Sequence, residues 1–158
     1  MDIKKMLEAQ KELDKANMKK GGLTEYPLEL VQTAYRVELG ELLQEWKQFK
    51  FWKINKGEID RDKMLKEWAD CMHFALSLEE YENETSRSEY VVQTIMNDVL
   101  RRVKADIYKI LDCCFKSKMW RLESTIALGL KLGYTLEELE QAYWKKNKIN
   151  WERIEGGY

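Results

Sequence analysis

Two pairs of acidic residues, each with a spacing of three, constrain the possible folds of this sequence more than any other feature. Glu38 and Glu41 lie in VELGELLQEW, and Glu67 and Asp70 lie in KEWADCMHFAL. In a helix this spacing places both carboxylates of a pair on one face, about 4.5 Å apart along the axis. The apolar residues around each pair recur with helical periodicity, which puts the acids on or beside the core-facing stripe. We therefore expect two consecutive helices that direct four acids toward the core.

These four carboxylates predict a metal-binding catalytic centre. Like charges on half-buried faces destabilise one another unless a cation compensates them, and neither acidic stripe contains a Lys or Arg. Oxygen ligands without His or Cys favour Mg²⁺, with Mn²⁺ as a second option. The plainer interpretation is a solvated helix surface, because Glu is common in helices. Two pairs on consecutive core-facing stripes favour the metal site, with Glu38, Glu41, Glu67 and Asp70 as ligands and catalytic residues.

The composition predicts one all-α domain. The 158 residues are enough to bury a core, and a single Pro with eight Gly leaves little turn chemistry for a β-fold. Charged residues make up 35% and aromatic residues 11%, a balance typical of globular rather than disordered chains. We expect a helical bundle built around the two acidic helices, with residues 1–158 forming a single domain.

Charge and apolar content exclude several classes of partner. A net charge of −1 gives no basic surface for non-specific nucleic-acid binding. No apolar run approaches the roughly 18 residues of a membrane span, and MDIKKMLEAQ is unlike a signal peptide. Cys71, Cys113 and Cys114 lie in helical patterns without the spacing of a zinc site. We expect a cytoplasmic protein that neither spans a membrane nor binds nucleic acid directly.

Capping residues and breaks divide the chain into helices. We expect a first helix over residues 2–20, stopped by Gly21 and Gly22, and a turn at 24–27 in which Thr24 caps the next helix. The first acidic helix is expected to run to about Lys47, and the second from Asp60 or Asp62 to about Leu78. A polar surface linker over 79–87 should follow, and then two helices in 88–116 and 117–132. After Gly133, a capping box of Thr135 and Glu138 should open the last helix.

Three further side chains on or beside apolar stripes are candidates for contacts with a ligand. Gln10 lies within the apolar stripe of the first helix with Asp14 beside it, and Phe74 faces the same way as Glu67. An amide offers both a donor and an acceptor to a pyrimidine edge, although a tolerated boundary residue would look the same. Core packing alone would also explain Phe74. His73, the single His, lies nearly opposite the apolar arc and is expected to be structural.

A loop and the last helix supply candidate phosphate-binding groups. The loop QFKFWKINKGEIDRD alternates aromatic residues with lysines, which suits base stacking and phosphate binding, or equally an apolar plug with solubilising lysines. In the last helix the apolar stripe of Leu136, Leu139 and Tyr143 turns polar without changing direction. Its polar members, which can donate hydrogen bonds to phosphates and sugar hydroxyls, are Lys146, Asn147, Asn150 and Arg153.

The acidic pattern resembles that of the all-α nucleoside triphosphate pyrophosphatases. The segments VELGELLQEWKQFKFWK and EWADCMHFALSL, with the closing YWKKNKINWERIEGGY, are similar to the dimeric dUTPase branch, in particular its phage-type members. The resemblance covers residues 1–75 and 134–158. We therefore expect 134–158 to form a motif helix with a tail, and 85–132 to be a variable insert.

The resemblance implies Mg²⁺-dependent hydrolysis of dUTP to dUMP and pyrophosphate by attack at the α-phosphorus, with dUDP as a further substrate in some members. It implies that Gln10 recognises uracil, with Asp14 as a weaker candidate, and that Phe51 packs against the base. Lys53 and Lys56 are then candidates for phosphate contacts. One of the acids would activate the attacking water, and the first acidic pair supplies the two candidates for this base.

The resemblance also implies a homodimer in which each active site borders the neighbouring chain. The apolar helices in 88–132 offer an interface, with Ile95, Val99 and Ile107 as candidate positions. Some phage-encoded members of the family bind a repressor protein, so a regulatory role in the host cytoplasm is a further hypothesis. A related pyrophosphatase that acts on dCTP or non-standard nucleotides is the enzymatic alternative.

Overall fold

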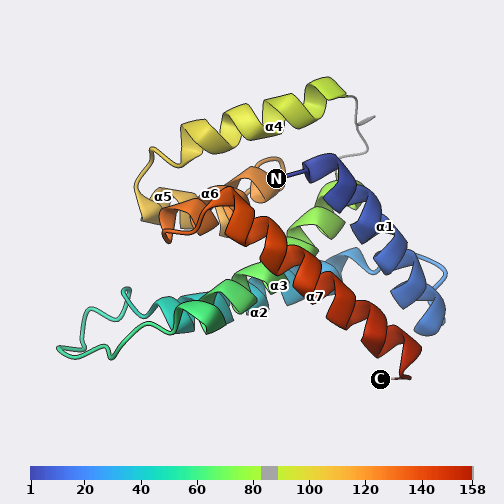
Figure 1. Ribbon diagram of the computed structural model, residues 1–158, viewed down its shortest axis with the longest axis horizontal. Coiled ribbons are helices and arrows are strands. Elements are labelled where there is room, and N and C mark those ends of the chain that lie inside the picture. The colour runs from blue at the N-terminus through green and yellow to red at the C-terminus, as the bar shows by residue number, and fades with distance from the viewer. Residues whose placement is uncertain (83–88, 158) are drawn as a thin grey trace.

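The computed structural model describes residues 1–82 and 89–157, and all regular structure within this part of the chain is helical (Figure 1). The helices are α1 (Ile3–Lys20), α2 (Leu28–Trp46), α3 (Arg61–Glu82), α4 (Glu89–Arg102), α5 (Ile107–Lys116), α6 (Arg121–Lys131) and α7 (Leu136–Glu155). The expected all-α bundle, built around the acidic helices α2 and α3, is confirmed. None of the described helices is long and apolar enough to cross a membrane.

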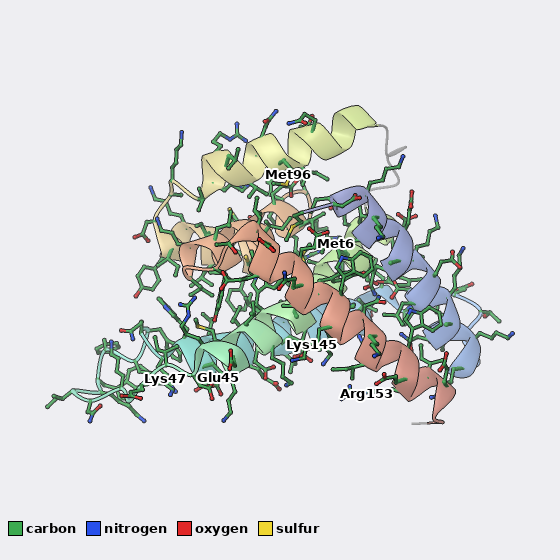
Figure 2. The ribbon with its side chains drawn as sticks, in the orientation of Figure 1. Met6, Glu45, Lys47, Met96, Lys145 and Arg153 are labelled. Carbon is green, nitrogen blue, oxygen red and sulfur yellow. The ribbon has the colours of Figure 1, made fainter. Side chains whose placement is uncertain are left out.

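Helix α3 forms the centre of the bundle and packs against α1, α2, α6 and α7 (Figure 1). From Trp68 to Leu78 every side chain except Phe74 is buried. A helix covered on all sides needs apolar or small residues on all faces, and ADCMHFALSL largely meets that requirement. Met6 is fully buried where α1 packs on α3 (Figure 2). The acidic pair of α3 therefore faces side chains from several helices at once.

Most helix ends follow the expected capping residues. In the capping box of α7, Thr135 accepts a hydrogen bond from the Glu138 amide at 3.2 Å, and Glu138 accepts one from the Thr135 amide at 2.7 Å. Asp60 caps α3 by accepting from the Lys63 amide at 3.0 Å. The expected cap at Thr24 is wrong, because α2 begins only after Pro27, whose side chain has no acceptor for a capping bond.

Helix α3 is longer than expected. Its predicted end near Leu78 is wrong, because the helix continues to Glu82 through residues that we assigned to a polar linker. Tyr81 stacks on Tyr26 with ring centroids 3.5 Å apart, and Glu82 forms an ion pair with Arg121. These contacts with distant residues stabilise a turn that lacks apolar periodicity.

The middle region holds three described helices rather than the expected two. Residues 103–106 separate α4 from α5, and Asp106 caps α5 by accepting from the Tyr108 amide at 2.8 Å. This break was not predicted, because apolar residues recur with helical periodicity on both sides of it. Helices α4 and α5 pack on α6, which packs on α3. Residues 83–87 of the expected linker lie outside the described residues.

Two glycines within helices give opposite predictions for substitution by alanine. A Cβ at Gly129 would lie 2.7 Å from Trp68 Nε1 and 2.8 Å from Leu139, so Gly129→Ala should destabilise the fold by about 1–3 kcal/mol. A Cβ at Gly40 meets nothing within 4 Å, so Gly40→Ala should stabilise by about 0.5–1 kcal/mol. Denaturant unfolding of both variants measures the difference. Equal shifts would contradict the close packing of α6 against α3 and α7.

Candidate active site

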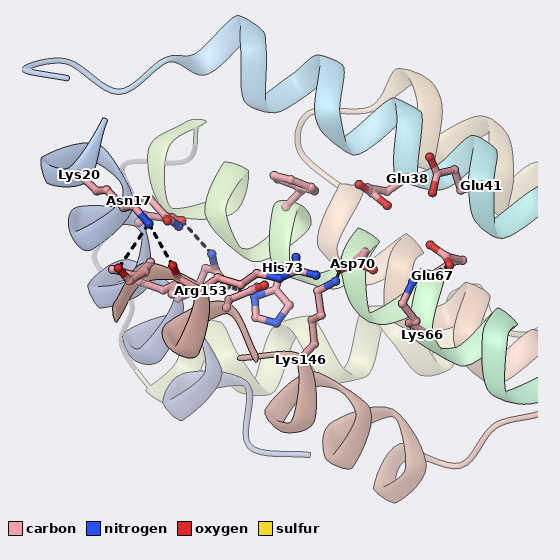
Figure 3. A pocket seen from close by; sticks show the side chains of 16 residues that line it. Asn17, Lys20, Glu38, Glu41, Lys66, Glu67, Asp70, His73, Lys146 and Arg153 are labelled. Carbon is pink, nitrogen blue, oxygen red and sulfur yellow. Dashed lines mark hydrogen bonds and ion pairs between the residues drawn. The ribbon is translucent and has the colours of Figure 1, made fainter. Parts of the chain in front are cut away.

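Helices α2 and α3 pack against each other and bring their acidic residues together (Figure 3). One carboxylate oxygen from each of Glu38, Glu67 and Asp70 lies within 4.8 Å of the other two, and we call these three residues the carboxylate cluster. Glu38 and Glu67 are half-buried, and Asp70 is 8% exposed. Glu41 lies beside Glu38 and lines the same pocket, but it is exposed and stands outside the cluster.

The pKa shifts in the carboxylate cluster show that its negative charge is incompletely compensated. Burial, followed by the charges of Asp70, Glu41 and Glu67, raises the pKa of Glu38 to about 7. Burial also raises the pKa of Asp70, although Lys146 opposes that shift. A bound divalent cation would oppose both effects that raise these pKa values. It would replace the hydration that the carboxylates lose on burial, and it would screen their negative charges from one another. The donor set of carboxylates alone therefore fits a divalent cation that prefers oxygen ligands.

Two lysines partly compensate the cluster. Lys146 of α7 forms an ion pair with Asp70, and Lys66 Nζ lies 3.0 Å from Glu67 (Figure 3). The acidic stripes themselves contain no basic residue, so their periodicity gave no sign of these pairs. Lys146 reaches the cluster from a helix far along the sequence, and only the packing of α7 on α3 places it there.

The carboxylate cluster lines a pocket of about 470 Å³ bordered by α1, α2, α3 and α7 (Figure 3). The predicted substrate-binding residues that line it are Gln10, Asp14, Phe74, Lys146, Asn150 and Arg153. Lining residues that the sequence did not single out as part of a site are Leu13, Asn17, Lys20, Lys66, His73 and Ile154. The pocket thus has an acidic wall from α2 and α3 and a basic wall from α7.

A chain of buried polar side chains joins α1 to α3 at this pocket. Gln10 Nε2 donates to Asp14 Oδ1 at 2.8 Å, and Gln10 Oε1 lies 2.6 Å from His73 Nδ1. His73 is 4% exposed and stacks on Tyr143 with ring centroids 4.4 Å apart. Its expected position opposite the core is wrong, because α1 and α7 cover that side of α3 as well.

A model of the dUTPase family matches residues 2–158. This chain belongs to the dUTPase family. The dUTPase is therefore a hydrolase that converts dUTP, and the family suggests a divalent metal that the carboxylate cluster could bind. The match includes the middle region, which the resemblance of individual segments left out. A search among curated proteins found no match for the chain.

The aromatic loop between α2 and α3 lies apart from the pocket of this dUTPase. It projects away from α1 and from the C-terminal end of α7 (Figure 1). Phe51 in this loop is 88% exposed. Lys53 is exposed, and Lys56 Nζ donates to the Gln48 carbonyl at 2.8 Å. Within one chain, the structure does not bring Phe51, Lys53 or Lys56 to the pocket. Their contacts with dUTP stay predictions.

Helix α7 presents only part of its predicted polar stripe to the pocket. Asn147 is 7% exposed and packs into the protein rather than lining the pocket, whereas its neighbours in the stripe face it. The end of α7 is held on α1, because Lys20 Nζ donates to the Arg153 carbonyl at 3.0 Å. The end of α7 that carries Arg153 is therefore held in place by a hydrogen bond from α1 to its backbone.

Proposed function

We propose that this dUTPase binds Mg²⁺ through Glu38, Glu41, Glu67 and Asp70 and hydrolyses dUTP to dUMP and pyrophosphate in this pocket. The observation that supports the proposal most is the convergence of three carboxylates within 4.8 Å, opposite basic residues of α7. Mn²⁺ would suit the same oxygen ligands. When bound, the ion would neutralise a triphosphate that the acids alone would repel.

Residues of the chain account for the proton transfer and for binding the phosphates. Water attacks the α-phosphorus, the bond to the oxygen that bridges to the β-phosphorus breaks, and pyrophosphate leaves. A carboxylate orients the water and accepts its proton. Glu38 and Glu41 are the candidates for this role, and both line the pocket. Lys146, Arg153 and the neutral donor Asn150 would stabilise charge on the phosphates.

The uracil base of dUTP would bind at the α1 side of the pocket, where Gln10, Asp14 and Phe74 line the wall. Gln10→Ala removes the amide that we assign to the uracil edge, so kcat/KM for dUTP should fall roughly 10- to 100-fold, the worth of one or two hydrogen bonds. The preference for dUTP over dCTP should weaken as well. Steady-state kinetics with dUTP, dCTP, dTTP and dUDP provide the measurement. Equal use of dUTP and dCTP by the unmutated protein would favour a broader pyrophosphatase.

We also propose a homodimer in which the loop over residues 47–60 contacts the neighbouring chain. Exposed Phe51, Trp52 and Ile54 support this interface, since clustered apolar side chains on a surface favour association. Ile95 and Val99 are buried within the chain and do not offer an interface, contrary to expectation. Light scattering at low concentration should give twice the chain mass of 18.9 kDa. A monomer with full dUTP turnover would contradict the dimer.

A regulatory role follows from the family resemblance alone. Binding of a repressor protein, a phage origin and a place in the host cytoplasm stay predictions. Titration of a purified phage repressor into the dUTPase, with and without nucleotide, would test the binding role.

A further inference from the structure

The two ends of the Gln10 side-chain amide have different fixed neighbours. Gln10 is 4% exposed, its nitrogen donates to Asp14 Oδ1 at 2.8 Å, and its oxygen lies 2.6 Å from His73 Nδ1. An amide has two N–H donors and an oxygen with two lone pairs. These contacts use one of each, which leaves one donor and one acceptor for a ligand in the pocket.

Of these two neighbours, Asp14 can determine which way the amide points. An ionised carboxylate only accepts hydrogen bonds, so it must face the nitrogen of Gln10. Burial lowers the pKa of His73 to about 3, so its ring is neutral and carries a single proton. If the amide rotated by 180°, His73 could respond by moving that proton to Nε2, which lies 3.4 Å from the Tyr143 carbonyl. Asp14 has no such response while it is ionised.

The direction of the amide decides which pyrimidine it can pair with. Uracil presents a donor at N3 beside an acceptor at O4, whereas cytosine presents an acceptor at N3 beside a donor at N4. An amide pairs with either base in the same pose, provided that it exchanges its oxygen and nitrogen. Thymine presents the same edge as uracil and differs only by its 5-methyl group. A fixed amide therefore separates uracil from cytosine, but it does not separate uracil from thymine.

We propose that Asp14 is a positioning residue that gives this dUTPase its preference for uracil over cytosine, by holding the Gln10 amide in one orientation. This inference rests on the proposed role of Gln10 in reading the base. Asp14 itself is 9% exposed on the turn of α1 that follows Gln10, so it is fixed by the helix and by packing against α3.

Asp14→Asn tests the proposal with little change in shape. An Asn at this position offers both a donor and an acceptor, so it can pair with Gln10 in either orientation. We expect the ratio of kcat/KM for dUTP to that for dCTP to fall by about 10- to 100-fold, the worth of one or two hydrogen bonds. The ratio for dUTP to dTTP should stay unchanged, which a general disturbance of the pocket would not produce.

Three outcomes of this comparison are distinguishable. An unchanged dUTP to dCTP ratio in Asp14→Asn would overturn the proposal, provided that Gln10→Ala lowers this ratio. A KM that rises equally for all three nucleotides would overturn it too, because Asp14 would then contact a part that they share. If Gln10→Ala leaves the ratio unchanged, Gln10 does not read the base, and its proposed role fails together with this inference.

A pH profile of the unmutated dUTPase tests the same point without a substitution. Burial raises the pKa of Asp14 to about 6, with Ser77 and Gln10 opposing the shift and Glu80 adding to it. Protonated Asp14 can donate to the Gln10 oxygen, so the dUTP to dCTP ratio should fall as the pH drops from 8 through about 6 to 5.

Other groups that face Asp14 do not explain such a change. Tyr26, Tyr81 and Tyr143 have pKa values raised by burial and stay protonated in this range, and His73 stays neutral. Glu80 forms an ion pair with Lys11 at 2.6 Å. An effect of pH on the hydrolysis step, which dUTP and dCTP share, changes kcat/KM equally for both nucleotides and cancels in the ratio. A ratio that is constant from pH 8 to 5 would overturn the proposal, and a fall that persists in Asp14→Asn would do the same.

Discussion

Glu67→Gln should lower kcat for dUTP by about 10²- to 10³-fold while the helical fold persists. The substitution keeps the volume of the side chain but removes one charge from the carboxylate cluster. Charge stabilisation by a bound metal ion is worth several kcal/mol, and about 1.4 kcal/mol corresponds to a factor of ten. The unfolding temperature of the metal-free protein should not fall, because the change removes one of several mutually repelling carboxylates. Steady-state turnover and thermal unfolding by circular dichroism provide the measurements.

Glu8→Gln is the matched control for this substitution. Glu8 is exposed on α1 and does not line the pocket, so its loss of charge should leave turnover unchanged. If Glu67→Gln turned over dUTP at the unmutated rate with the same Mg²⁺ requirement, Glu67 would not be a metal ligand.

Lys146→Met should lower turnover by about 10²-fold and yet tighten the binding of Mn²⁺ to the nucleotide-free protein. Lys146 pairs with Asp70, so its ammonium group competes with a metal ion for that carboxylate. Coupling between two such bound groups is typically 1–3 kcal/mol, so the metal affinity should rise roughly fivefold or more. Turnover falls because the same ammonium group is proposed to stabilise charge on the phosphates. Calorimetric titration with Mn²⁺ and steady-state kinetics separate the two effects.

Lys145→Met controls for the loss of a positive charge on α7. Lys145 is exposed and lines a second groove, between α3 and α7, rather than the pocket of the carboxylate cluster. Neither Mn²⁺ affinity nor turnover should change in this variant. An unaltered Mn²⁺ affinity in Lys146→Met would show that the ion pair with Asp70 does not oppose metal binding.

The fold was predictable from the sequence wherever local interactions determine it. The capping box of Thr135 and Glu138 joins residues three positions apart, and the acidic stripes recur with the period of one helix. The last turn of α3 was missed because it depends on the contacts of Tyr81 and Glu82 with residues far away in the chain. The break before Asp106 was missed because apolar residues on both sides continue a helical period.

The candidate site was also predictable where it depends on the periodicity of one helix, but not where it depends on contacts between helices. Periodicity placed Gln10 and the acids on inward-facing stripes, and the pocket contains them. It could not show that Lys146 reaches Asp70 or that His73 contacts Gln10, because each pair joins two helices whose relative position only packing determines. The position of Phe51 could not be predicted, because an aromatic residue in a loop gives no information on the direction in which that loop projects.

The central claim is that the carboxylate cluster holds the divalent ion on which dUTP hydrolysis depends. Turnover of dUTP by chelator-treated protein, titrated with Mg²⁺, tests it most directly when the unmutated protein and Glu67→Gln are compared. We predict no turnover in excess chelator, recovery as Mg²⁺ is added to the unmutated protein, and a much higher Mg²⁺ requirement in Glu67→Gln. Full turnover in excess chelator, or the same Mg²⁺ dependence in both proteins, would contradict this account.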